Sequence, residues 1–410
     1  MNYTLLMEIA SQIGCRIATG GAETYRVEES VNRILTAYGV ESRVYSVPNS
    51  LIITLIIPGQ PPMTQLCRME RKGTDLDVVE RYSNLGRRIC EEKPELETAM
   101  AWVKATEKER KHYNLPTVLL GHVLVAWGFC IFFGGGLMDS VCAAACGLLL
   151  GVVQHFMGKL HTNVFFQNIA AAFLMAFLAY GISMFGMIPN VDSAVIGALM
   201  LLVPGVLFTN AMRDIIFGDT NSGVSRVVEA LLIAVAVALG TAAAWHLCAA
   251  LWGLPRQMGA ISHNPLVTCF VSFAACAGFV IVFNVHGYGS LLCAFGGVIT
   301  WGVYCLALAL GCEHLVCCFI ATGAAAVYSE VMARVRKYPA ISYLVISVLP
   351  LIPGAGAYYA AQQAIGGNMS LAAQYGLDTL ATAGVMAAGI LVVSTAVRMW
   401  TAHKRLRYGK

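Results

Sequence analysis

The sequence has little charge for its length. Of its 410 residues only 12% are Asp, Glu, Lys or Arg, whereas a soluble protein has about 25%. Hydrophobic residues make up 58% of the chain, and the mean hydropathy is +0.68. This composition indicates a membrane protein and excludes a chain that is soluble throughout. The formal net charge of +4 is too small to suggest nucleic acid as a partner.

Motifs of enzymes, metal sites and signal peptides are also missing. The chain has no ATP-binding loop, no Gly-x-Ser-x-Gly and no Ser/His/Asp or metal box in its N-terminal part. Its 14 cysteines form no CxxC pair, and its nine histidines lack ligand spacing. We therefore expect no metal and no cofactor, and we assign the cysteines to packing. The first twenty residues contain Glu8 and lack a basic start before an apolar run, which predicts no cleavable signal peptide.

Residues 1–113 hold 15 of the 27 Lys and Arg and most of the acids. Their apolar residues recur first with the period of a helix, then with that of a strand, then again with that of a helix. The breaks fall at glycine and proline clusters. We predict a small α+β domain with helices near 2–19, 22–38, 75–92 and 95–112 and strands near 43–47, 51–57 and 63–69.

The most distinctive part of this domain is the stretch 20–29, Gly-Gly-Ala-Glu-Thr-Tyr-Arg-Val-Glu-Glu. Glu23 and Arg26 are three residues apart, and Glu29 and Arg33 are four apart, so each pair can meet on a helix surface. One interpretation is a solvated face held by salt bridges. The other is a conformational gate or a hydrolytic site. The candidate residues of this motif are Glu23, Tyr25, Arg26 and Glu29.

After residue 113 the chain consists of long apolar runs that predict ten transmembrane helices. The predicted inner loops hold nearly all Lys and Arg of this part, whereas the outer loops hold Arg256 alone. By the positive-inside rule, both termini and the N-terminal domain are expected to be cytoplasmic. The predicted spans are 116–135, 138–157, 163–186, 191–209, 226–250, 264–284, 288–310, 314–329, 340–361 and 379–399, the eighth being short.

A Pro-Gly pair occurs inside the fourth predicted span and again inside the ninth. Leu201–Gly205 is Leu-Leu-Val-Pro-Gly, and Pro350–Gly354 is Pro-Leu-Ile-Pro-Gly. Each pair is expected to kink or interrupt its helix. Corresponding breaks in two halves are typical of transporter binding sites, and units of five spans must repeat with inverted topology. The predicted halves are 114–252 and 253–410, the second with a basic cytoplasmic tail. Two unrelated proline kinks are the alternative.

Polar residues gather after the first Pro-Gly pair, from Asn210 to Arg226, with Glu229 one turn further. Ionisable residues at membrane depth usually line a pathway or pair with each other. Asn210 and Arg213 would suit an anionic or zwitterionic substrate, and a carboxylate would suit proton coupling. An ordinary cytoplasmic loop is the alternative. The candidates for substrate binding or coupling are Pro204, Gly205, Asn210, Arg213, Asp214, Asp219, Ser222, Arg226, Glu229, Glu330, Arg334, Pro353, Gly354 and Tyr358. Asp192, Glu313 and Asp378 lie at outer span ends, where charge needs no functional explanation.

These motifs, in this order and spacing, resemble the threonine/serine exporter family over essentially the whole chain. The chain is similar to a fused form of two subunits that elsewhere are separate membrane proteins. The resemblance implies export of a small metabolite from the cytoplasm, driven by the proton motive force. Some relatives are associated with threonine and serine and the two-subunit relatives with succinate, so amino acid and dicarboxylate both stay open.

We therefore predict a secondary active exporter in the inner or plasma membrane rather than an enzyme. Its expected partners are a small-molecule substrate, protons and the lipid bilayer. The alternatives are a membrane-embedded hydrolase and a channel or scaffold with a regulatory domain. The sequence leaves the oligomeric state open, a homo-oligomer included.

Overall fold

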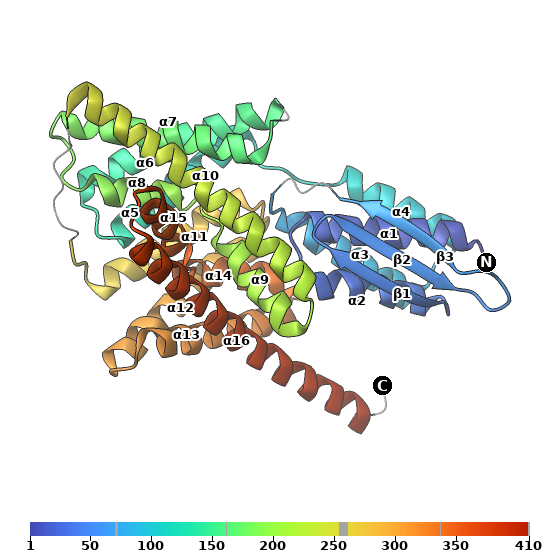
Figure 1. Cartoon of the computed structure of the whole chain (residues 1–410). Helices are drawn as coiled ribbons and strands as arrows, with labels where there is room; N and C mark the ends of the chain where they lie inside the picture. The colour runs from blue at the N-terminus through green and yellow to red at the C-terminus, as the bar shows by residue number, and fades with distance from the viewer. Residues whose placement is uncertain (70–72, 161, 254–260, 337, 409–410) are drawn as a thin grey trace.

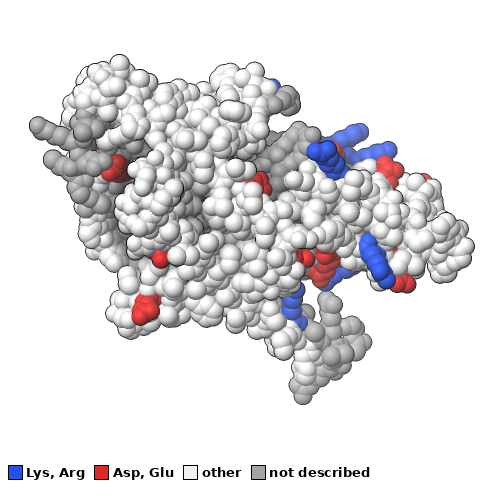
Figure 2. Space-filling model, in the orientation of Figure 1, with Lys and Arg blue, Asp and Glu red and all other residues white. Residues whose placement is uncertain are grey.

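The computed structural model describes residues 1–69, 73–160, 162–253, 261–336 and 338–408. Arg256 and Lys337, which entered the charge argument above, lie outside the described residues. The described chain is largely helical and has one sheet (Figure 1). Figure 2 shows charged side chains gathered over the first part of the chain, while the visible face of the remaining helices is largely uncharged.

The described part of the N-terminal region, residues 1–113, contains four helices and a three-stranded antiparallel sheet in the order β1-β2-β3. A two-residue turn pairs Val47 with Ser50 and so sets the register of the first hairpin. The predicted boundaries of these elements are close to the observed ones. They are α1 (Tyr3–Thr19), α2 (Thr24–Ala37), β1 (Glu41–Val47), β2 (Ser50–Ile56), β3 (Met63–Arg68), α3 (Leu76–Glu92) and α4 (Leu96–Lys108).

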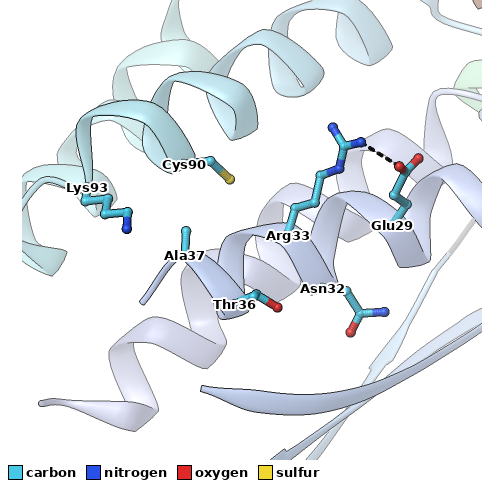
Figure 3. A pocket seen from close by; sticks show the side chains of 7 residues that line it. All are labelled: Glu29, Asn32, Arg33, Thr36, Ala37, Cys90 and Lys93. Carbon is cyan, nitrogen blue, oxygen red and sulfur yellow. Dashed lines mark hydrogen bonds and ion pairs between the residues drawn. The ribbon is translucent and has the colours of Figure 1, made fainter. Parts of the chain in front are cut away.

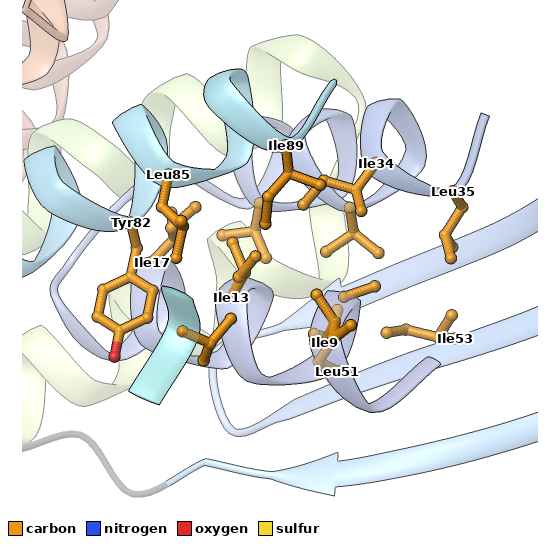
Figure 4. Packing of buried hydrophobic residues seen from close by; sticks show 14 of the residues in the cluster. Ile9, Ile13, Ile17, Ile34, Leu35, Leu51, Ile53, Tyr82, Leu85 and Ile89 are labelled. Carbon is orange, nitrogen blue, oxygen red and sulfur yellow. The ribbon is translucent and has the colours of Figure 1, made fainter. Parts of the chain in front are cut away.

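The apolar faces of these elements meet in one core (Figure 4). Alternate residues of β2 are buried, as are residues of α1 spaced four apart, because the two periods bring those side chains to one face. Ile341 and Val345 belong to the same core although they come from a later helix. The N-terminal region therefore packs directly against the rest of the protein. Cys15 of α1 is paired with Cys67 of β3, which the assignment of cysteines to packing did not foresee.

The rest of the chain forms two successions of helices in the same order: three long helices, two short helices around a break, and one very long helix (Figure 1). The first succession is α5 (Leu115–Phe132), α6 (Leu137–Lys159), α7 (Val164–Met184), α8 (Val191–Leu199), α9 (Gly205–Phe217) and α10 (Thr220–Trp252). The second is α11 (Pro265–Val282), α12 (Gly289–Ala309), α13 (His314–Arg336), α14 (Ala340–Val348), α15 (Gly354–Ile365) and α16 (Met369–Tyr408), with a 3-10 turn at Leu349–Leu351.

Eight described helices are long and apolar enough to cross a membrane, and the pair α14 and α15, bent by 50°, makes a ninth span if it is counted as one. The chain is thus a polytopic helical membrane protein, and the tenth span stays a prediction. The prediction of a short eighth span was wrong, because α13 continues to Arg336. The polar stretch after Asn210, for which an ordinary cytoplasmic loop was the alternative interpretation, is helical, with only Gly218 and Asp219 between α9 and α10.

Candidate functional site

The two Pro-Gly pairs interrupt their helices with the same local backbone. Pro204 has φ −81° and ψ 39°, and Pro353 has φ −77° and ψ 41°. The N–H of Gly205 donates to Val203 O at 2.9 Å, and that of Gly354 donates to Ile352 O at 2.7 Å. These bonds close three-residue turns centred on the prolines. Each turn ends one short helix and begins the next, as the sequence predicted.

The two breaks lie against each other. A Cβ atom added to Gly205 would collide with the Ile352 side chain and lie 3.5 Å from Gly354 Cα. One added to Gly354 would collide with the Val203 side chain and lie 3.7 Å from Gly205 Cα. Val203 and Ile352 hold the same position, one residue before the proline, so the contact is reciprocal. A side chain at either glycine would therefore have to displace the branched residue of the other break, whereas its distance to the backbone of that break would be an ordinary van der Waals contact.

The start of α2 docks on α9 and α10 through a group of buried charges. Arg213 of α9 pairs with Glu23, and Arg226 Nε of α10 lies 3.0 Å from Asp214 Oδ2. Thr24 Oγ1 donates to Asp214 Oδ2 at 3.4 Å. We call Glu23, Arg26, Arg213, Asp214 and Arg226 the charge cluster. All of its members except Arg26 are at most 4% exposed. Two sequence motifs about 190 residues apart thus form one structure.

The charge cluster holds three arginines and two carboxylates, which leaves one positive charge in excess. Burial raises the pKa of Glu23, but Arg213 and Arg26 lower it more, so the pKa lies below its ordinary value and the carboxylate is charged. Among the described protein atoms, four of its nitrogens and one carboxylate oxygen have no hydrogen-bond partner: Nε of Arg26, Arg213 and Arg226, Nη1 of Arg226, and Oε2 of Glu23. The hydrogen bonding of the cluster is therefore incomplete on both the donor and the acceptor side.

Three further contacts surround this cluster. Ser222 Oγ donates to Ser46 O at 3.3 Å, which ties α10 to β1. The ring of Tyr25 lies 4.9 Å from that of Phe217. The guanidinium of Arg398, near the end of α16, lies 4.6 Å from the Tyr25 ring centre. Sequence analysis missed Arg398, for which a basic residue at the inner end of the last span was the only signal.

Several predicted residues lie elsewhere. Glu29 pairs with Arg33 at 2.7 Å on the exposed face of α2, beside a shallow depression of about 560 Å³ (Figure 3). Glu330 and Arg334 pair with each other at 2.8 Å on α13. Tyr358 is buried in an apolar cluster with residues of the first succession. The remaining candidates lie near the charge cluster in sequence: Asn210 is buried on α9, Asp219 precedes α10, and Glu229 is half-buried on α10.

A second polar contact joins the N-terminal region to the second succession of helices. Glu80 of α3 lines a small cavity with Arg336, Ser342 and Tyr343. Burial and the neighbouring Asp77 raise the pKa of Glu80 from 4.5 to about 7, against the opposite effect of Arg81 and Arg336. No sequence motif pointed to this residue.

The Glu80 contact predicts a pH dependence of stability. Between pH 4.5 and about 7 the folded protein keeps a proton that the unfolded chain has lost. The contribution of the Glu80 carboxyl to the free energy of unfolding is therefore complete below pH 4.5 and is lost as the pH rises through 7. Glu80→Gln should match the wild type in melting temperature at pH 5 and exceed it at pH 8, by the equivalent of roughly 2 kcal/mol. The exposed Glu91→Gln is the control, and an equal response of both variants would contradict the prediction.

Two family models and several known proteins are similar to this chain. A family model described as "Putative threonine/serine exporter" matches residues 8–248, and another described as "Threonine/Serine exporter, ThrE" matches residues 268–396. The chain is 23% identical over 314 residues to a protein named "Threonine/serine exporter" from Corynebacterium glutamicum. That match covers 75% of this chain but only 59% of the relative.

Two further relatives cover less of this chain. The protein named "Probable succinate transporter subunit YjjP" from Escherichia coli is 26% identical over 247 residues, which are 59% of this chain and 93% of the relative. The "Probable threonine/serine exporter" of Mycobacterium tuberculosis is 20% identical over 240 residues, or 57% of this chain and 45% of the relative. No solved structure matches the chain.

Proposed function

Because this chain belongs to the threonine/serine exporter family, we propose that it exports a small polar metabolite, threonine, serine or a related carboxylate, driven by the proton motive force. The family is one of exporters, so the hydrolase alternative is set aside. The observation that carries the proposal is the contact between the two Pro-Gly breaks. Paired helix breaks at the centre of a membrane protein are typical of secondary transporters.

The proposed topology is two inverted repeats of five spans, residues 114–252 and 253–410, with residues 1–113 as a cytoplasmic domain. An inverted arrangement requires that the loops near Arg213 and Arg334 share one side of the membrane. Arg213 pairs with Glu23, and Arg336, two residues after Arg334, lines a cavity with Glu80. Both ends thus meet the N-terminal region, which supports the topology with both termini cytoplasmic.

In this proposal the charge cluster closes the cytoplasmic side. Its ion pairs tie the N-terminal region to α9, which begins at the first Pro-Gly break, and to α10. Protonation of Asp214 would remove the charge that Arg226 pairs with, and it would thereby weaken the contact. A carboxylate in this position can couple proton entry to opening. Glu229, one turn after Arg226 on α10, is the second candidate for the coupling group.

The test is flux of labelled serine, threonine and succinate in proteoliposomes, with and without an imposed proton gradient. We expect gradient-stimulated flux of at least one of them, abolished by a protonophore. Asp214→Asn should lose the stimulation if Asp214 couples, and Glu229→Gln is the parallel variant. Because Asp214→Asn also leaves Arg226 buried without its partner, the flux is compared only in protein shown to be folded. Flux that ignores the gradient would contradict coupling and favour a channel. No flux from folded wild-type protein would overturn the proposed function.

A further inference from the structure

A cavity of about 490 Å³ lies where the N-terminal region meets the ends of two membrane helices. Its wall comes from the end of α1, the residues around the start of α3, the segment between α4 and α5, the start of α5 and the end of α11. Its volume is within the roughly 300–1,000 Å³ of small-molecule sites. None of its described lining residues is a candidate for substrate binding or coupling, so the proposed export does not explain it.

The apolar part of this wall places the cavity at one surface of the membrane. Val118 lies near the start of α5, and Ile281 and Val282 are the last residues of α11. Both helices are long and apolar enough to cross a membrane. A place where one span begins and another ends lies at the boundary between the hydrocarbon and the headgroups of the bilayer. The cavity is therefore within reach of lipid headgroups.

Two arginines form the polar part of the wall, and they share one carboxylate. Glu107 Oε1 lies 3.0 Å from Arg16 Nη2 and 3.0 Å from Arg110 Nη1. The other oxygen of Glu107 accepts a hydrogen bond from Tyr82 OH at 2.6 Å. The side chain of Arg16 is 44% exposed, so its guanidinium is accessible to a further anion. Arginine matches the geometry of a phosphate group, which it can bind through two parallel hydrogen bonds.

The acid in the wall, Asp75, is already engaged by the protein. Its Oδ2 lies 3.3 Å from Arg110 Nη2. Its Oδ1 accepts hydrogen bonds from Asn284 Nδ2 at 3.0 Å and from the N–H of Val78 at 3.2 Å. Asp75 therefore offers little to a positively charged headgroup, and the cavity favours an anionic ligand over a zwitterionic one.

The segment next to the cavity carries an excess of positive charge. Residues 104–112, which precede α5, hold four Lys and Arg and two Glu. Two residues of this segment line the cavity, Arg110 and the exposed His112. Basic residues immediately outside a membrane helix attract anionic lipids. The charge of this segment and the arginines of the wall thus favour the same kind of ligand.

The polar and apolar parts of the wall together select an amphiphile. A free phosphate would bind the arginines and leave the apolar residues of α5 and α11 uncovered. A hydrocarbon chain alone would cover those residues and make no use of the guanidinium groups. A phospholipid at the membrane surface has both a phosphate and apolar chains, and so it matches the whole wall.

We propose that this cavity binds the headgroup of an anionic phospholipid. The phosphate lies against Arg16 and Arg110, and the first methylene groups of the chains lie against Val118 and the end of α11. The bound lipid joins α1 of the N-terminal region to α5 and α11, so it stabilises the contact between that region and the membrane helices. This inference goes beyond the proposed export and requires only that α5 and α11 cross the membrane.

The test measures binding to the purified full chain in detergent by native mass spectrometry, with phosphatidylglycerol, phosphatidylcholine and glycerol 3-phosphate as ligands. Phosphatidylglycerol should bind more tightly than the other two. Arg16→Gln should weaken its binding by about fivefold, and Arg16→Lys should weaken it less because the charge remains. Glu107 still pairs with Arg110 in both variants, so the fold is retained. Arg33→Gln is the matched control, since Arg33 also pairs with a glutamate but does not line the cavity.

Three results would overturn the site. Equal phosphatidylglycerol binding by Arg16→Gln and Arg33→Gln would show that the cavity does not hold the lipid. Equal binding of phosphatidylcholine and phosphatidylglycerol to the wild type would exclude selection by charge. Glycerol 3-phosphate that binds as tightly as phosphatidylglycerol would assign the cavity to a free phosphate ester. None of these results bears on the exporter, whose candidate residues lie elsewhere, and an absence of flux in proteoliposomes would leave the lipid site standing.

Discussion

Replacing Arg213 by Gln is expected to destabilise the folded protein by about 3–5 kcal/mol. Arg213 is 4% exposed and Glu23 is 1% exposed, so the substitution leaves a carboxylate buried without its main partner. The cost comes from the stranded charge more than from the lost attraction. Removal of both charges in the variant Glu23→Gln/Arg213→Gln should therefore recover much of the loss. The measurement is the free energy of unfolding, or the melting temperature, of the two single variants and the double variant in detergent.

The same helix supplies the matched control for this double-mutant cycle. Glu29 and Arg33 pair at 2.7 Å, but their side chains are 49% and 59% exposed. An exposed pair contributes about 0–1 kcal/mol, so Arg33→Gln should be nearly neutral. Limited proteolysis adds a readout of docking, because Arg213→Gln should expose the junction between the N-terminal region and α9. If Arg213→Gln destabilises no more than Arg33→Gln, the charge cluster does not hold that junction.

The contrast between these two pairs shows what local sequence patterns can predict. The Glu29–Arg33 pair follows from a spacing of four residues on one helix and was predicted correctly. The Glu23–Arg26 pair, predicted for the same kind of reason, also forms, at 3.9 Å, but the closest partner of Glu23 is Arg213. No helical period relates residues 190 positions apart. The sequence identified both motifs without indicating that they touch.

The prediction of secondary structure likewise succeeded where the pattern is local and failed where distant residues are involved. The helices and strands of the N-terminal region were predictable because their apolar residues repeat with a clear period beside glycine and proline breaks. The helix after the first Pro-Gly break was not, because α9 carries Arg213 and Asp214 where a membrane helix should be apolar. Partners from α2 and α10 compensate these charges.

A methyl group at the crossing of the two breaks is expected to disrupt the membrane region. Gly205→Ala places a Cβ atom against the Ile352 side chain, and Gly354→Ala does so against Val203. Overpacking of this kind costs about 1–3 kcal/mol, and proteoliposome flux should fall with it because the break defines the start of α9. Ile352→Ala should restore much of the stability of Gly205→Ala by removing the colliding group, and Val203→Ala should do the same for Gly354→Ala.

Gly302→Ala is the control, since a Cβ atom at this α12 position meets nothing within 4 Å. It should be neutral or more stable by up to about 1 kcal/mol, because alanine favours a helix over glycine. The sign of the change in stability thus distinguishes a Gly→Ala substitution that overpacks the structure from one that only raises helix propensity. If Gly205→Ala behaves like Gly302→Ala, the breaks do not pack closely. The reciprocal contact allows a stricter test. If the two halves are equivalent, the two glycine variants should lose similar stability, and each should be rescued only by its own partner substitution. A large loss at one glycine and none at the other would contradict the inverted repeat itself.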